Sequence, residues 1–173
     1  MNILDILKQY AERPTDTNTD FDEVSRQVAP DVLGQGIAES FRSDSTPAFG
    51  SMVGQLFGNS NGSQRAGLLG QLIQAAGPAV LAGVAGGGFG RILEGLRGAG
   101  SNPASPPTVS TSDADRMTPD EVEQLAAAAE KNDPTIIDKV GSYYSAHPEV
   151  VKVLGGAALA IALGQIATRM QRR

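Results

Sequence analysis

The chain is 173 residues long, contains no cysteine and a single histidine, and carries a formal net charge of −5 at pH 7. The lack of cysteine excludes a disulfide scaffold, a thiolate zinc site and a cysteine nucleophile, and a lone histidine excludes any site built on two imidazoles. The acidic balance argues against general nucleic-acid binding, which needs a basic face. The length suits one ordinary domain or two small helical ones.

Glycine and proline are abundant and unevenly placed. The 21 glycines and 10 prolines make about 18% of the chain, against about 12% in average proteins. Seventeen of the glycines fall between Gly34 and Gly100. Residues 98–117 have almost no bulky apolar side chain, so burial cannot offset the entropy of ordering them. We therefore expect a flexible Gly/Ser/Pro linker at 98–117, between a Gly-rich multihelical segment, 1–97, and a C-terminal segment, 118–173.

The N-terminal segment is predicted to form a series of short amphipathic helices. Residues 2–13 make the first, because their apolar side chains recur at helical spacing before Pro14. Asp20 and Glu23 resemble a capping box that opens the second. Five further apolar stripes predict helices through the rest of the segment: Leu33, Ile37 and Phe41; Phe49, Met52, Val53, Leu56 and Phe57; Leu68, Leu69, Leu72, Ile73 and Ala76; Val80, Leu81 and Val84; and Phe89, Ile92, Leu93 and Leu96.

The positions of the prolines support a helical fold. At the first position of a helix, proline loses no hydrogen bond and presets φ. Thr118, Pro119, Asp120 and Glu121 fit a complete capping box with acidic residues in the first turn. No alternating run of β-branched residues competes with these helices, so we predict an all-α, multihelical protein. Six prolines stand where a helix is expected to begin: Pro30, Pro47, Pro78, Pro119, Pro134 and Pro148.

The C-terminal segment is predicted to contain three helices. The first two have apolar faces beginning at Val122 and at Ile136, and the third runs from Pro148 to about Met170. The middle of the third, residues 153–164, is apolar on every side, which is typical of a core helix or a membrane helix. Its 12 uninterrupted apolar residues fall short of the roughly 20 that a span needs, which favours the core helix.

Small residues recur at every fourth position in this sequence. This spacing places them on one helix face and lets two backbones approach closely. The spacing occurs in three places, one of them Gly83 and Gly87 beside Gly86 and Gly90. The other two are expected to be helix-packing seams, used inside a soluble fold or for self-association: Gly50, Gly54 and Gly58, and Gly156, Ala160 and Gly164. Basic residues around the last apolar run offer an alternative, the flanks of a short tail anchor or of a helix lying on anionic lipid: Lys152, Arg169, Arg172 and Arg173.

The sequence offers no arrangement of residues that supports catalysis. His147 lies in a helix break before Pro148, where a capping or turn role is expected. The glycine run at 83–91 lacks the preceding strand and the Gly-Lys-Ser/Thr ending of a phosphate-binding loop. We therefore predict no catalytic, cofactor-binding or metal-binding residues, and we expect that the protein is not an enzyme.

Two parts of the chain carry a family resemblance. The first is Phe21-Asp22-Glu23-Val24 through Ala29-Pro30, with residues 41–53 and 57–60, and the second is Thr118-Pro119-Asp120-Glu121-Val122 through His147-Pro148, with residues 154–159. Together they resemble a group of bacterial proteins near the YidB-like domain of unknown function. The resemblance implies a small, Gly-rich, multihelical protein of bacterial source, and it carries over no catalytic residues.

These observations lead to one expected function and one alternative. We expect a non-enzymatic helical interaction or scaffold protein, with a protein partner or self-association and without nucleic acid or cofactor. The alternative is a peripheral or tail-anchored membrane protein that uses the basic apolar C-terminal helix. Residues 1–8 lack the basic region and the continuous apolar core of a signal peptide. We therefore expect a cytoplasmic location, with inner-membrane association as the alternative.

Overall fold

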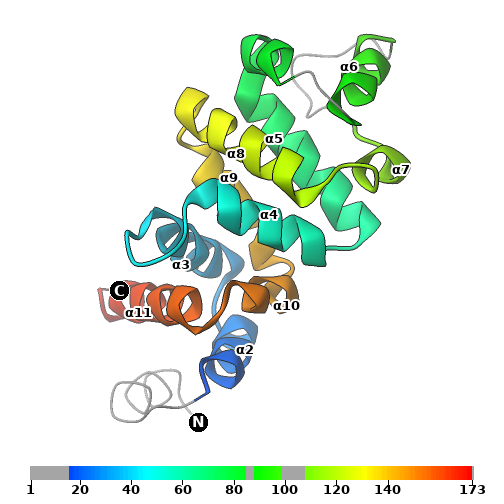
Figure 1. The fold of residues 1–173 in the computed structure, drawn as a ribbon. Coiled ribbons are helices and arrows are strands. Elements are labelled where there is room, and N and C mark those ends of the chain that lie inside the picture. The colour runs from blue at the N-terminus through cyan, green and yellow to red at the C-terminus, as the bar shows by residue number, and fades with distance from the viewer. Residues whose placement is uncertain (1–15, 85–87, 99–107, 173) are drawn as a thin grey trace. The chain divides into compact units, whose positions relative to one another are not determined.

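The computed structural model describes residues 16–84, 88–98 and 108–172. These residues form ten α-helices and one short 3-10 helix, with no strand among them (Figure 1). The prediction of an all-α, multihelical fold is therefore confirmed. The helix predicted at residues 2–13 lies outside the described residues, and so do residues 99–107 of the predicted linker.

The chain divides into two compact units, and we describe each by itself. Unit 1 combines Met1–Pro47 with Ile137–Arg173, and unit 2 is Ala48–Ile136. This division differs from the predicted one, in which a linker at 98–117 separates two consecutive segments. The physical reason is that helices more than 100 residues apart in the chain bury their apolar faces against each other in unit 1.

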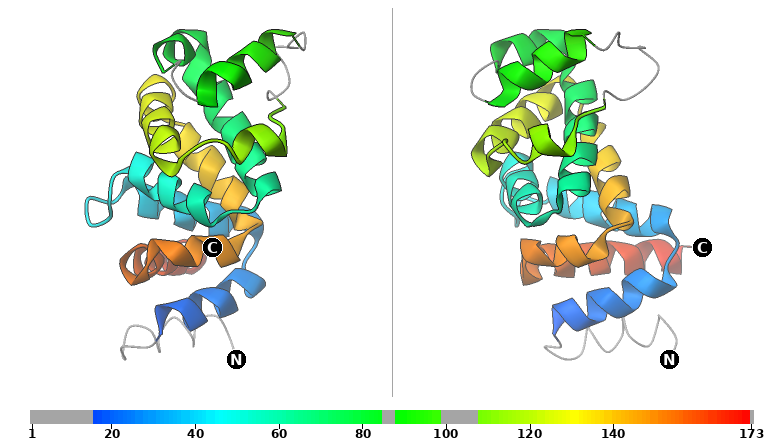
Figure 2. Two further views of the ribbon diagram at one scale, coloured as in Figure 1. Left: turned by 45° about the vertical axis from the view of Figure 1, so that its right-hand side comes forward. Right: turned by 90° about the vertical axis from the view of Figure 1, so that its right-hand side faces the viewer.

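Unit 1 is built around α11. This helix packs along α3, and α2 lies against it (Figures 1 and 2). Leu159, Leu163 and Ile166 on α11 are fully buried, as is Ile37 on α3, so the apolar last helix supplies the core of the unit. The elements of unit 1 are α2 (Thr17–Gln27), α3 (Pro30–Arg42), α9 (Ile136–Ser145, apart from its first residue), α10 (Pro148–Val151), the 3-10 helix η1 (Lys152–Leu154) and α11 (Gly156–Gln171).

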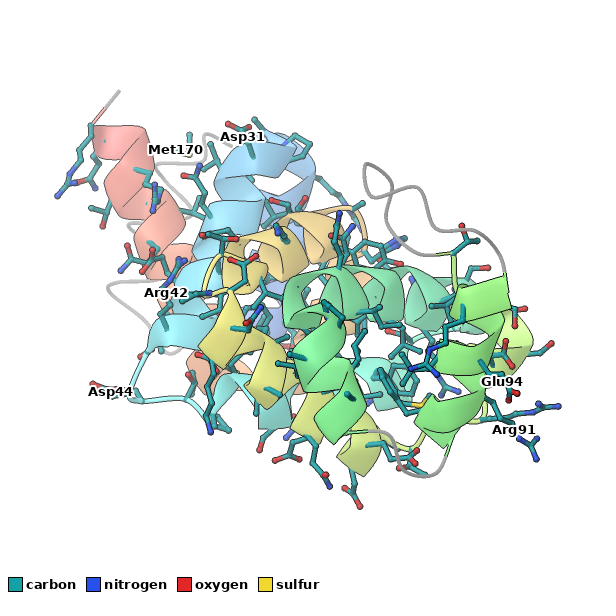
Figure 3. All side chains as sticks on the ribbon, turned by 90° about the horizontal axis from the view of Figure 1, so that it is seen from above. Asp31, Arg42, Asp44, Arg91, Glu94 and Met170 are labelled. Atoms are coloured by element: carbon teal, nitrogen blue, oxygen red, sulfur yellow. The ribbon has the colours of Figure 1, made fainter. Side chains whose placement is uncertain are left out.

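Unit 2 is organised around α8, which contacts both α4 and α5. Its apolar face is fully buried, as the spacing from Val122 to Ala129 predicts. In α6, Phe89 and Ile92 are buried, whereas Arg91 and Glu94 point outward from the ribbon (Figure 3). The elements of unit 2 are α4 (Phe49–Asn59), α5 (Gly62–Gly83), α6 (Gly88–Gly98), α7 (Thr111–Ala114) and α8 (Pro119–Asn132).

The helix starts follow the predicted signals only in part. The capping box at Thr118 is present: its hydroxyl accepts from the Glu121 N–H at 3.3 Å, and Glu121 Oε2 accepts from the Thr118 N–H at 2.9 Å. Four of the six prolines begin a helical stretch: Pro30, Pro119 and Pro148 occupy the first turn of a helix, and Pro78 resumes the helix after the break at Gly77 within α5. The other two, Pro47 and Pro134, each precede a helix by two residues.

The capping box predicted at Asp20 and Glu23 is wrong. The helix begins one turn earlier, at Thr17, with Asp16 as its N-cap. Asp16 Oδ1 accepts a hydrogen bond from the Asn18 N–H at 3.1 Å, and Asp20 lies in the first turn. An aspartate one turn upstream offers the same side-chain oxygen, so the helix gains a turn while its first N–H groups stay satisfied.

The continuous helix predicted from Pro148 to Met170 is also wrong. The chain forms the single turn of α10 and the 3-10 turn η1 before α11 begins at Gly156. Gly155 separates them with φ 86° and ψ 171°, a conformation that side-chain-bearing residues rarely adopt. The glycine pair at 155 and 156 therefore ends one helix and starts another.

The second half of the predicted linker is packed and partly helical. Val109, Ala114 and Met117 are buried, and α7 contacts α5. Asp115 accepts a hydrogen bond from Arg65 Nη1 at 3.2 Å. The prediction of a flexible linker is therefore wrong for residues 108–117, because three spaced apolar side chains in a polar run are enough to bind the segment to unit 2.

Candidate interaction surface

The first predicted seam lies on the face of α4 that contacts α8. A methyl group added at Gly50 would come 2.8 Å from the Glu123 carbonyl oxygen, and one at Gly54 would come 3.0 Å from that of Pro119. At Gly58 the nearest atom would be at 3.5 Å, an ordinary contact. Gly50 and Gly54 thus allow the two backbones to approach closely, and this seam is filled within unit 2.

The second predicted seam lies on a face of α11 that is not packed in the same way. Gly156 and Gly164 are exposed and Ala160 is half-buried. A methyl group at Gly164 would meet nothing within 4 Å, and one at Gly156 would meet Thr17 Oγ1 at 3.2 Å. The structure therefore leaves this seam open along most of its length.

Apolar side chains extend this open seam into a surface. Val153 is 38% exposed, more than any other large hydrophobic residue among those described. Ala157 is exposed and Ile161 is half-buried. Val153 lies in η1, before the break at Gly155, so it is not counted with the others. We call the surface on α11 the α11 face: Gly156, Ala157, Ala160, Ile161 and Gly164. Contiguous exposed apolar surface is a feature of many protein–protein interaction sites.

Two of the basic residues predicted to flank a membrane segment are instead tied to other helices of unit 1. Lys152 Nζ lies 2.9 Å from Asp22 Oδ2, and Arg169 donates to Gln35 Oε1 at 2.6 Å and lies 3.6 Å from Glu39. Arg172 is exposed at the end of α11, and Arg173 lies outside the described residues. Fewer charges are therefore available to an anionic surface than the sequence suggests.

A short chain of charged side chains continues from Glu39. Arg42 lies 3.4 Å from Glu39 and donates to Asp138 Oδ2 at 2.7 Å, which joins α3 to α9. The hydrogen bond to Asp138 is the main reason that the pKa of Arg42 lies above its ordinary value. These side chains are partly exposed, so each pair contributes at most about 1 kcal/mol. They fix the orientation of helices and offer no chemistry of their own.

The closest helix contacts in unit 1 use glycines that the sequence analysis did not single out. A methyl group at Gly141 on α9 would collide with the Gly34 carbonyl oxygen, and one at Gly36 would come 2.6 Å from Ile166 Cγ1. Gly34 and Ala38 show the same spacing of four as the predicted seams, which could have marked this crossing. Gly141 stands alone in its helix, so no local pattern identifies it.

The single histidine lies at the turn between α9 and α10. His147 occupies the N-cap position of α10, and its Nδ1 is 3.7 Å from Glu149 Oε1. The centres of the Tyr143 ring and the imidazole are 5.4 Å apart. Burial raises the pKa of the Tyr143 phenol above its ordinary value. Within the described parts of the chain, no group of three histidine or acidic side chains could hold a metal ion.

One described helix, α5, is long and apolar enough to cross a membrane, which is weak evidence for a span because core helices and signal sequences meet the same criteria of length and composition. The helix is also interrupted. Gly77 has φ 71° and is followed by Pro78, so the helical path breaks there. Asn132 Nδ2 donates to the Ala75 carbonyl oxygen at 2.9 Å, which satisfies one of the acceptors beside the break.

Comparison with known proteins adds no relative from which a function could be carried over. No family model matches the chain, and no curated protein and no solved structure match it.

Proposed function

We propose that this chain is a non-enzymatic helical interaction protein that self-associates through the α11 face. The observation that carries the proposal is the contrast between the two seams. The seam at Gly50 and Gly54 is filled by α8, whereas Gly164 has open space where a side chain would stand. Helix faces with small residues bind other helices by close backbone approach, and an unfilled one is available to a second molecule.

Light scattering coupled to size-exclusion chromatography tests the proposal. Gly164→Arg places a long charged side chain on the α11 face, and because the site is open it leaves the fold of unit 1 intact. Gly95→Arg is the matched control, since Gly95 on α6 also has nothing within 4 Å of an added methyl group. We expect the wild type and Gly95→Arg to form dimers at high concentration and Gly164→Arg to stay monomeric. A monomeric wild type at all concentrations would contradict self-association.

Membrane association through the basic apolar C-terminal helix is the alternative function, and the length and apolar composition of α5 add only weak support for a membrane role. The break at Gly77 and the ion pair of Lys152 with Asp22 weigh against it. Co-sedimentation with vesicles containing anionic lipid separates the two proposals. We expect the protein to stay in the supernatant at physiological salt, and binding that persists at high salt would favour the membrane function.

A relationship to the YidB-like proteins and a bacterial, cytoplasmic setting belong to the same proposal. The multihelical fold is compatible with both. Protein–protein contact through α11 needs neither a cofactor nor a nucleic acid, which is consistent with the acidic composition.

A further inference from the structure

We propose that two copies of the chain pair α11 against α11 in antiparallel orientation, across a two-fold axis that passes between Ile161 and Gly164. This inference rests on the proposed self-association and adds its partner, orientation and register. In a two-fold interface the same patch serves both copies, so the patch must be complementary to itself. The α11 face meets this requirement in its shape and in the charges at its two ends.

The shape of the face is complementary to itself about its centre. Ala157, Ile161, Gly164 and Thr168 follow one another at intervals of four, three and four residues, so they share one side of α11. With the axis between 161 and 164, Ile161 of each copy lies over Gly164 of the other. Ile161 supplies a half-buried apolar side chain, and Gly164 supplies an empty space. The same register sets Ala157 opposite Thr168.

The charges at the ends of the face favour the antiparallel orientation. Gly156, at the start of α11, lies beside Thr17, so the exposed Asp16 is close to that end. Arg172 is exposed at the other end, and within the described ranges neither residue forms an ion pair. Antiparallel pairing brings the Arg172 end of one copy to the Asp16 end of the other. Opposed helix dipoles favour the same arrangement, and complementary charge selects orientation.

Disulfide mapping tests the orientation without background, because the chain has no cysteine of its own. We would prepare the full chain with Ala157→Cys and, separately, with Thr168→Cys, and oxidise each alone and the two mixed. Opposite positions in an antiparallel pair come within disulfide reach, whereas in a parallel pair positions 157 and 168 are about 16 Å apart along the axis. Gly95→Cys, at an open position on α6, measures random collision.

We expect the mixture to yield disulfide dimer at least tenfold faster than either single variant or the Gly95→Cys control. Rapid cross-linking of Thr168→Cys alone would indicate parallel pairing and overturn the inference. A mixture no faster than the control, in a protein that light scattering shows to be dimeric, would place the interface elsewhere and also overturn it. A protein that is monomeric by light scattering would instead refute the self-association on which the inference rests.

Discussion

At the scale of single residues, the glycines of this chain fall into groups that composition cannot separate. Gly50 and Gly54 lie where two helix backbones approach closely, and Gly77 and Gly155 have a positive φ. Gly164 has neither role: it is helical and has open space beside it. The sequence pattern identifies the spacing of four but not whether another helix lies against it. That information comes from a segment about 70 residues away, which no local window contains.

This difference between glycines leads to a paired stability prediction. Gly164→Ala should raise the free energy of unfolding by about 0.5–1 kcal/mol, because alanine is the better helix former and the site is open. Gly50→Ala gains the same propensity, but its methyl group collides with the Glu123 carbonyl oxygen. Overpacking of this kind costs about 1–3 kcal/mol, so Gly50→Ala should be destabilising overall.

Chemical denaturation, monitored by circular dichroism at low protein concentration, measures both variants. Gly95→Ala, at an open position on α6, serves as the control and should behave like Gly164→Ala. Equal effects of Gly50→Ala and Gly164→Ala on stability would mean that the close approach of α4 and α8 is not needed.

At the scale of helices, the sequence predicts which helices form better than it predicts where each helix begins and ends. The starts at Pro30 and Pro119 are confirmed because proline and the residues around it act locally on φ and on the first N–H groups. The start predicted at Asp20 is wrong because an equivalent signal competes: Asp16 caps the helix one turn before Asp20. Local patterns do not rank such alternatives.

The last helix gives a prediction at this scale. A chain that ends at Gly155 lacks α11, whose Leu159, Leu163 and Ile166 are fully buried in unit 1. We expect α2 and α3 to lose protection from hydrogen exchange while the helices of unit 2 retain it. A chain that ends at Gln171 is the control and should keep the protection of the full chain. If α11 acted only as a membrane anchor, its removal would leave α2 and α3 protected.

At the scale of the whole molecule, the division into two compact units is the feature that the sequence predicts least well. Residues 98–117 look like a boundary because they are rich in small and polar side chains. Yet Val109, Ala114 and Met117 are buried, and the compact units change at Pro47 and at Ile136. The composition of a segment indicates how much conformational entropy it loses on ordering. A compact unit is instead defined by which helix faces, distant in the sequence, pack against each other. The contact of α3 with α11 joins parts of the chain more than 100 residues apart.

The same division predicts how fragments behave. Residues 48–136 form an uninterrupted stretch with its own buried core, so we expect this fragment to give a helical circular dichroism spectrum and a cooperative thermal transition. Residues 137–173 contain only one part of unit 1 and should be largely unfolded alone. Mixing the 137–173 fragment with a fragment of residues 1–47 should restore the helicity of unit 1. Failure of 48–136 to fold would show that unit 2 depends on unit 1.

The arrangement of unit 1 also sets an order of events during synthesis. Its first helices leave the ribosome early, but α11, which covers them, is made only after all of unit 2. Unit 2 can therefore fold on the ribosome while the apolar faces of α2 and α3 are still exposed, because α11 has not yet been made. During that interval the nascent chain exposes apolar surface, which makes an incompletely folded chain prone to aggregation. The translation of about 100 residues separates the two halves of one core.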